Sequence, residues 1–162
     1  MSKNKIALIW DLDGTLVDSY PAIMAGLEET YQHFGLNFDY DPVYDYILHF
    51  SVKELLEEVA DREGLDLTAL STYRANSLRE KNTAITLMPG SKKVLTWAKA
   101  RGIPNFIYTH KGDNAFALLD QLGISEFFTK VLTSQSGFAR KPDPEGVDYL
   151  VEKYQLNKET TY

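Results

Sequence analysis

Two aspartates, Asp11 and Asp13, stand two residues apart at the end of a short apolar run. Residues two apart in a strand point to the same side, so both carboxylates would face the crevice in which open α/β sheets bind ligands. Such a pair can hold a hard cation through oxygen. One carboxylate can also attack a substrate while its neighbour moves protons. Gly14 permits a tight turn after the pair, and Thr15 adds a hydroxyl.

The same acidic loop has two other interpretations. One is a calcium-binding EF-hand, which requires glycine at the sixth position of the loop and an acid at the twelfth. Those positions hold Leu16 and Ala22, so the EF-hand is excluded. The other is an acidic loop that simply ends a strand.

Three apolar runs could provide the strands that position these carboxylates. Ile6–Trp10 is apolar on both faces, which is typical of a strand buried on both sides of a parallel sheet. Ile103–Tyr108 and Phe127–Leu132 have the same character. A helical pattern follows each of these two later runs. Strands and helices in alternation predict an α/β sheet built from right-handed crossover units.

Cap and stop residues mark these two later helices. Asp113 is placed to cap a helix that Gly123 ends. Asp143-Pro144-Glu145 has a capping acid, a proline at the first helical position and an acid near the positive end of the helix dipole.

Residues 21–82 show helical periodicity and no strand pattern. Ile23, Leu27 and Tyr31 fall on one helical face. Ser51-Val52-Lys53-Glu54 has the form of a capping box. We therefore expect residues 1–18 and 86–162 to form the α/β core, with residues 19–85 inserted as a helical cap. The cap would cover the Asp11 crevice, with residues 15–20 and 86–90 as hinges.

Composition limits the classes of function. The chain has 162 residues, 44% of them hydrophobic, and a formal net charge of −6. An acidic chain is a poor general binder of nucleic acid or of an anionic membrane. With no cysteine, a thiolate nucleophile and a Cys-ligated zinc are excluded. No apolar stretch has the length of a membrane span, and we expect a cytoplasmic protein.

The string Asp11-Leu12-Asp13-Gly14-Thr15 after an apolar strand resembles the first motif of the haloacid dehalogenase superfamily, in the phosphatase subgroup with a helical cap, similar to phosphoglycolate phosphatases. The resemblance covers nearly the whole chain. It implies a Rossmann-like core and hydrolysis of a small phosphorylated metabolite through an aspartyl-phosphate. Asp11 would be the nucleophile, Asp13 the acid and base, and both would hold Mg²⁺.

Later motifs of the same family match in order. Thr109 stands at the end of the second core strand, where a hydroxyl would bind phosphoryl oxygens. Lys141, in Arg140-Lys141-Pro142-Asp143-Pro144, would neutralise charge shared by the nucleophile and the phosphoryl group. Gly14, Thr15 and His110 would line the substrate site. By themselves, Thr109 could be a turn residue, His110 an exposed loop histidine and Lys141 part of a solvated basic pair.

The fourth motif of the family, one or two acids after the next core strand, is missing. Glu152 and Glu159 precede the place where that strand would begin, and a solvated helix face explains them better. We therefore expect a core truncated at its fourth strand in a native protein that continues beyond Tyr162. Since Ile6–Trp10 should be an interior strand, an end at Tyr162 would leave one of its sides bare. A strand-swapped dimer is an alternative.

Two other functions fit the same residues. A phosphosugar mutase of the beta-phosphoglucomutase type would exclude water and return the phosphate to the sugar. A phosphate-binding protein with impaired catalysis would lack the last metal acid. The identity of the substrate does not follow from the sequence.

Overall fold

The computed structural model describes residues 5–162, which form two compact units. The first unit joins the described residues up to Asp18 with Thr86–Tyr162, and the second is Ser19–Ile85. The strands assigned among the described residues all belong to the first unit, and the second consists of helices.

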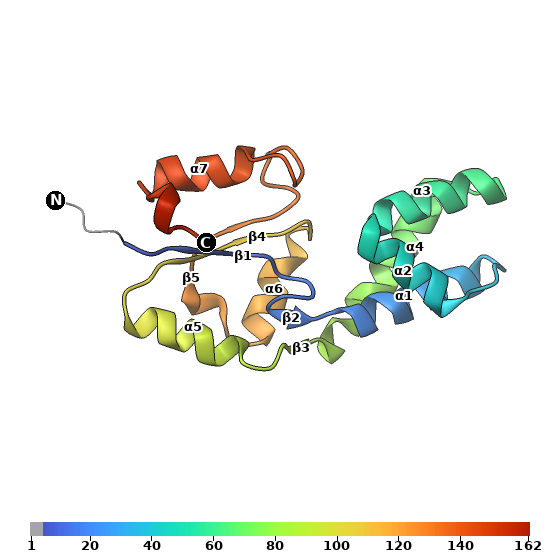
Figure 1. The fold of residues 1–162 in the computed structure, drawn as a ribbon. Helices are drawn as coiled ribbons and strands as arrows, with labels where there is room; N and C mark the ends of the chain where they lie inside the picture. The colour runs from blue at the N-terminus through green and yellow to red at the C-terminus, as the bar shows by residue number, and fades with distance from the viewer. Residues whose placement is uncertain (1–4) are drawn as a thin grey trace. The chain divides into compact units, whose positions relative to one another are not determined.

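A parallel sheet forms the centre of the first unit, with its strands in the order β1-β4-β5 (Figure 1). Leu8 pairs with Asn105, and Trp10 pairs with Ile107. All four residues of β4 are buried, as the apolar run predicts for a central strand. The fold class predicted from the sequence, an α/β fold with a parallel sheet, is confirmed. The bounds are β1 (Leu8–Trp10), β4 (Asn105–Tyr108) and β5 (Phe128–Leu132).

β5 differs from its predicted character. The sequence indicated a strand buried on both faces, but Thr129 and Lys130 are exposed. The physical reason is position: β5 lies at the edge of the sheet, with β4 as its one neighbour in the strand order. A lysine on such a strand hinders pairing with another chain, which is how edge strands are commonly protected.

β1 has neighbours on both sides, as expected of an interior strand. Opposite β4, the Ala7 N–H donates to the Thr160 carbonyl at 3.1 Å and the Ile9 N–H donates to the Tyr162 carbonyl at 2.7 Å. The Tyr162 N–H donates back to the Ala7 carbonyl at 3.0 Å. The expectation that this side of the strand is bare was therefore wrong, because residues 160–162 already pair with it in parallel.

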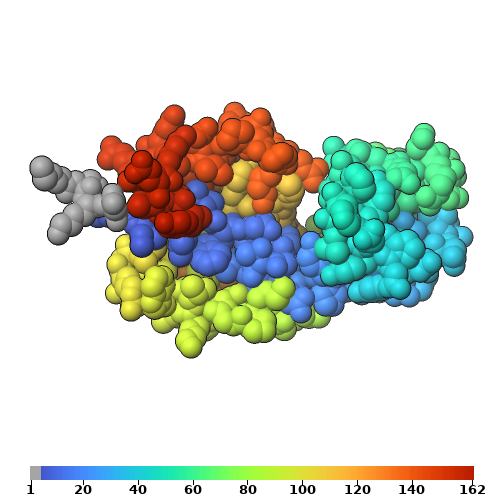
Figure 2. Space-filling view, in the orientation of Figure 1, coloured from blue at the N-terminus to red at the C-terminus, as the bar shows by residue number. Residues whose placement is uncertain are grey.

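Three helices cover the two faces of the sheet (Figure 1). α7 lies on one face, where Leu150 joins a cluster with Phe106, Tyr108 and Leu132. α5 and α6 lie on the other face, and Leu95 and the α6 leucines are buried there. In Figure 2 the dark blue N-terminal residues of this unit lie between the yellow α5 side and the red α7 side. The bounds are α5 (Ser91–Ala100), α6 (Asn114–Gln121) and α7 (Glu145–Lys153).

The first residues of α6 and α7 differ in detail from the predicted helix caps. Asp113 is the residue before α6, but its carboxylate does not cap the helix and accepts a hydrogen bond from Thr133 Oγ1 at 2.6 Å. α7 begins one residue later than expected, at Glu145. Asp143 still serves this end, because its Oδ1 accepts from the Glu145 N–H at 2.9 Å.

A short two-stranded antiparallel ladder joins the segments that lead out of and back into the first unit. β2 (Val17–Asp18) pairs with β3 (Thr86–Leu87). The Met88 N–H donates to the Leu16 carbonyl at 2.9 Å, and Ser91 Oγ donates to the same carbonyl at 2.9 Å. The sequence indicated only linkers here, because two-residue strands carry too little pattern to detect.

The second unit is helical, as its periodicity predicts. Ile23, Leu27 and Tyr31 form the buried face of α1. At the start of α3, Ser51 Oγ accepts from the Glu54 N–H at 3.1 Å and donates to the Glu54 carboxylate at 2.6 Å. No helix within residues 5–162 is long and apolar enough to cross a membrane. The bounds are α1 (Tyr20–His33), α2 (Tyr40–His49), α3 (Val52–Glu63) and α4 (Leu67–Lys81), and the 3-10 turns are η1 (Asn82–Ala84), η2 (Ser125–Phe127) and η3 (Lys158–Thr160).

Gly146→Ala tests the packing of α7 against the sheet. A Cβ at Gly146 would lie 2.6 Å from Tyr108 Cζ. The buried Tyr108 ring cannot simply turn away, because its hydroxyl donates to the Ala139 carbonyl at 2.7 Å. Overpacking of this kind costs about 1–3 kcal/mol, more than the roughly 1 kcal/mol that alanine gains over glycine in a helix. We expect a net loss in the free energy of unfolding, measured by urea denaturation.

The exposed Glu152 on the same helix provides the control. Glu152→Ala should change the free energy of unfolding by less than about 0.5 kcal/mol. A Gly146→Ala protein that is as stable as the parent would show that the Tyr108 ring is free to move.

Candidate active site

The site is built where the parallel strands end. Asp11 directly follows β1, Thr109 follows β4, and Thr133 follows β5. Parallel strands bring their carboxyl ends to one edge, so residues far apart in the sequence meet there. This is the edge at which the sequence placed the ligand crevice.

An ion pair joins Asp11 to Lys141 across this edge. Lys141 Nζ lies 2.8 Å from Asp11 Oδ1 and donates to it. The same ammonium group donates to the Tyr108 carbonyl at 3.0 Å, which fixes it above the end of β4. The Asp11 side chain remains 44% exposed and that of Lys141 29% exposed. Asp11 therefore has a fixed cation beside it and is still open to a ligand.

Asp13 lies in a tight turn. Gly14, with φ at +76°, allows the chain to turn back, and its N–H donates to the Val17 carbonyl at 2.9 Å. The Asp13 side chain is 25% exposed, but its Oδ1 is buried and accepts no hydrogen bond among the described residues. Thr15, by contrast, has an exposed side chain at the outside of the turn.

Lys111 faces Asp13, and the sequence analysis did not single it out. Its Nζ lies 3.5 Å from Asp13 Oδ1, and its side chain is only 6% exposed. A lysine buried to this degree is rare unless it is paired. The available signal was its place in Thr109-His110-Lys111, directly after a buried strand, which puts a cation at the same edge as the two aspartates.

Thr109 is buried, with 1% of its surface exposed. Its N–H donates to the Leu132 carbonyl at 2.9 Å, which continues the β4–β5 pairing by one residue. Its Oγ1 accepts from the Lys111 N–H at 3.0 Å. Because the hydroxyl is the acceptor in this bond, it keeps its own proton to donate to a ligand oxygen.

His110 is a neutral ring in a positive environment. The His110 residue is exposed by surface area, but partial desolvation of its ring lowers its pKa, the charges of Lys141 and Arg140 lower this pKa further, and Asp11 opposes them. At neutral pH the imidazole therefore carries no charge, and it would contact a ligand as a hydrogen-bonding group rather than as a cation.

Taken together, the edge can receive an anion and attack it. Two carboxylates stand beside two lysines, and a buried threonine supplies a hydroxyl. Within residues 5–162, no three His, Asp or Glu side chains are grouped so that they could hold a metal ion. Asp11 and Asp13 are the acids that could contribute to such a site, as hard oxygen donors.

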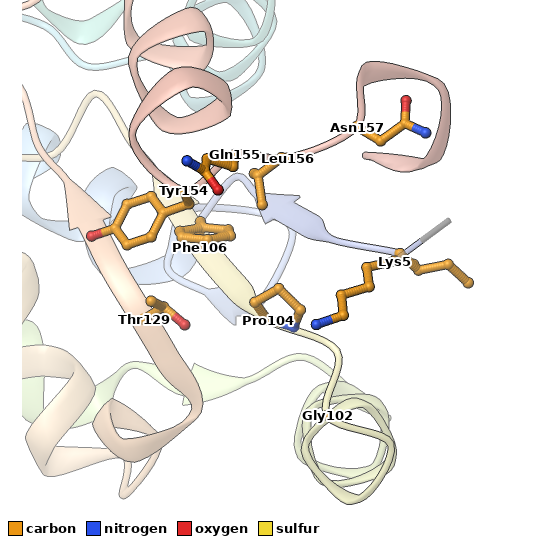
Figure 3. Close-up of a pocket in the computed structure, with 10 residues that line it drawn as sticks. Lys5, Gly102, Pro104, Phe106, Thr129, Tyr154, Gln155, Leu156 and Asn157 are labelled. Carbon is orange, nitrogen blue, oxygen red and sulfur yellow. The ribbon is translucent and has the colours of Figure 1, made fainter. Parts of the chain in front are cut away.

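A separate cavity of about 300 Å³ lies at the opposite edge of the sheet (Figure 3). Its lining includes Lys5, Pro104, Phe106 and Tyr154, near the amino ends of the strands. The Phe106 and Tyr154 rings pack with their centres 4.9 Å apart. None of the acids described above lines this cavity, so the candidate chemistry lies at the carboxyl edge.

Comparison with known proteins places the chain in context. Residues 8–162 match the model of the haloacid dehalogenase-like hydrolase family. A pyrophosphatase, PpaX, from Oceanobacillus iheyensis is 28% identical over 158 residues, covering 95% of this chain and 71% of the relative. A phosphoglycolate phosphatase from Pseudomonas fluorescens is 26% identical over 155 residues, covering 90% of this chain and 56% of the relative. The crystal structure of a hydrolase from Streptococcus pneumoniae has a TM-score of 0.65 and 32% identity, covering 96% of this chain and 80% of that one.

His110 reports on the charges at this edge. Removal of a nearby cation should raise the pKa of His110, because the ammonium of Lys141 disfavours the protonated ring. We expect Lys141→Met to move the NMR titration of the His110 ring to higher pH. Lys158→Met removes an exposed lysine that pairs with Asp148 and should leave that titration unchanged. An unchanged titration in Lys141→Met would mean that the His110 ring lies outside the field of Lys141.

Proposed function

The chain belongs to the haloacid dehalogenase-like hydrolase family, and from that premise we propose that it is a Mg²⁺-dependent phosphatase that cleaves a small phosphate monoester. The supporting observation is the exposed Asp11 carboxylate, paired with Lys141 at 2.8 Å and two residues from Asp13. The names of the two relatives, a pyrophosphatase and a phosphoglycolate phosphatase, support a small anionic phosphate compound as the substrate.

In the first step, a carboxylate oxygen of Asp11 attacks phosphorus and forms a new O–P bond as the bond to the leaving oxygen breaks. Lys141 stands beside Asp11 and would neutralise negative charge that Asp11 shares with the phosphoryl group. Thr109 would donate its hydroxyl proton to a phosphoryl oxygen. Asp13 gives a proton to the leaving oxygen, so that the product departs as an alcohol.

In the second step, water releases the phosphate. Asp13, now a carboxylate, takes a proton from the water as the water oxygen attacks phosphorus. The bond between the Asp11 oxygen and phosphorus breaks, which yields inorganic phosphate and restores the Asp11 carboxylate. Gly14, Thr15 and His110 would contact the substrate at the rim of the site.

The oxygen atoms available at the site are of the type that Mg²⁺ prefers as ligands. Asp11 supplies a carboxylate oxygen that is open to a ligand, and Asp13 would supply its backbone carbonyl oxygen, so both donors are hard. These two residues would hold the ion, with further oxygens from water and substrate. When bound, Mg²⁺ would supply positive charge that stabilises the phosphoryl oxygens in the transition state.

Asp11→Asn tests the nucleophile. The amide has nearly the volume of the carboxylate but cannot attack phosphorus, so Mg²⁺-dependent phosphate release should fall by about 10⁴-fold or more. Stability should change by less than about 1 kcal/mol, because an ion pair this exposed contributes little to folding. Phosphate release is measured with pyrophosphate, phosphoglycolate and an aryl phosphate as substrates. In a separate assay with a hexose phosphate as substrate, the product is analysed for isomerised sugar phosphate, which a mutase would form.

Asp148→Asn is the matched control, since it removes an exposed carboxylate that pairs with Lys158 away from the site. It should leave phosphate release unchanged. More than a few per cent of residual activity in Asp11→Asn would rule out Asp11 as the nucleophile. Absence of Mg²⁺-dependent release from every phosphate ester by the parent chain would contradict the phosphatase proposal itself.

A further inference from the structure

Lys111 is the one charged residue in the described part of the chain that is buried. Transfer of an ammonium group from water into protein is costly unless a counter-charge and hydrogen bonds replace the solvent. Its ion-pair partner is Asp13, whose Oδ1 lies 3.5 Å from Lys111 Nζ. A surface lysine could avoid this cost, so the position of Lys111 requires an explanation.

The backbone of Lys111 is held on both sides. Its N–H donates to Thr109 Oγ1 at 3.0 Å, and its carbonyl accepts from the Ser134 N–H at 2.9 Å. The first bond lies within the loop after β4, and the second ties that loop to the loop after β5. The side chain therefore leaves from a fixed point and reaches toward the turn that carries Asp13.

Asp13 has a buried carboxylate oxygen that faces the buried ammonium group of Lys111. Its Oδ1 is buried and accepts no hydrogen bond among the described residues, so the nearby ammonium group is what compensates it electrostatically. Asp11 has a lysine of its own, because Lys141 already pairs with it. Each of the two carboxylates thus has a separate lysine, and the two lysines come from different loops.

We propose that Lys111 is a positioning residue for Asp13. The buried ammonium group of Lys111 holds Asp13 Oδ1, so that Asp13 Oδ2 faces the oxygen of the leaving alcohol. This proposal rests on the phosphatase function proposed above. Orientation matters because a general acid must lie within hydrogen-bond reach of the atom that it protonates. The same ammonium group also faces the negative charge that Asp13 carries once its proton has left.

The leaving group distinguishes this role from others. An alkyl phosphate such as phosphoglycolate releases an alkoxide oxygen that needs a proton as the bond breaks, whereas p-nitrophenyl phosphate releases a stable phenolate that needs none. General acid catalysis contributes about 10²–10⁴-fold to rate. The contrast applies to the first step, because the water attack of the second step is common to both substrates. In single-turnover measurements of leaving-group release, Lys111→Met should therefore lower the rate for phosphoglycolate by about tenfold or more, and the rate for p-nitrophenyl phosphate by less than about threefold, with KM little changed.

Four further variants sharpen the test. Lys111→Arg keeps a positive charge near Asp13 and should recover part of the lost rate for phosphoglycolate. Asp13→Asn should lower kcat for both substrates, because Asp13 also takes the proton from water in the second step, but its first-step rate should show the same dependence on leaving group. Adding Lys111→Met to it should cause little further loss, because the two side chains act as one unit. Lys158→Met, which removes an exposed lysine, should leave both substrates unaffected.

Other outcomes would overturn the proposal. Equal losses of the first-step rate on both substrates would indicate a general structural role, and a rise in KM on both would indicate that Lys111 binds the phosphoryl group itself. A crystal structure of Lys111→Met gives a measure that does not depend on turnover, and an Asp13 side chain in its parent orientation there would refute the positioning role. Failure of the phosphatase proposal is recognised separately, by a parent chain that turns over neither substrate or by an active Asp11→Asn protein.

Discussion

The parallel pairing of β1 with β4 is the constraint on which the site depends. Because Trp10 lies opposite Ile107, the next residues on the two strands, Asp11 and Tyr108, emerge at the same edge. The hydrogen bond from Trp10 Nε1 to the buried Asn105 Oδ1 joins the same two strands at 2.8 Å. A slip of one residue would turn each side chain to the opposite face and separate the carboxylates from the lysines.

The carboxyl edge of the sheet carries positive side chains, although the chain as a whole has a negative net charge. The protein carries a formal charge of −6, yet each site carboxylate has a lysine beside it, and Arg140 adds a further positive charge near His110. An anionic substrate approaching this edge would therefore meet compensated carboxylates rather than bare ones. The positions of the lysines have different origins, since Lys141 comes from the loop before α7 and Lys111 from the loop after β4.

Sequence patterns predicted the parts of the structure that carry a strong local signal. The Ser51 cap and the helical periodicity of residues 21–82 each act within a few residues, and the structure shows them as expected. Ile6–Trp10 was predicted as a strand buried on both sides, but only Leu8–Trp10 form the strand, these residues are half-buried, and Ile6 is exposed. Features set by tertiary neighbours were missed. The exposed residues of β5 follow from its edge position, and Asp113 gives up its capping role because Thr133 lies within reach. Lys111 gave no sign of burial, since only the fold brings it to Asp13.

The β2–β3 ladder has a consequence for how the chain can vary in length. It closes the whole of residues 19–85 with two pairs of residues, next to the Met88–Leu16 hydrogen bond. The entropy of closing such a loop rises slowly, by about 0.6 kcal/mol for each doubling of its length. Descendants of this sequence could therefore gain or lose helices between Asp18 and Thr86 at small cost to the sheet, so the insert is free to diversify while the carboxyl edge stays the same.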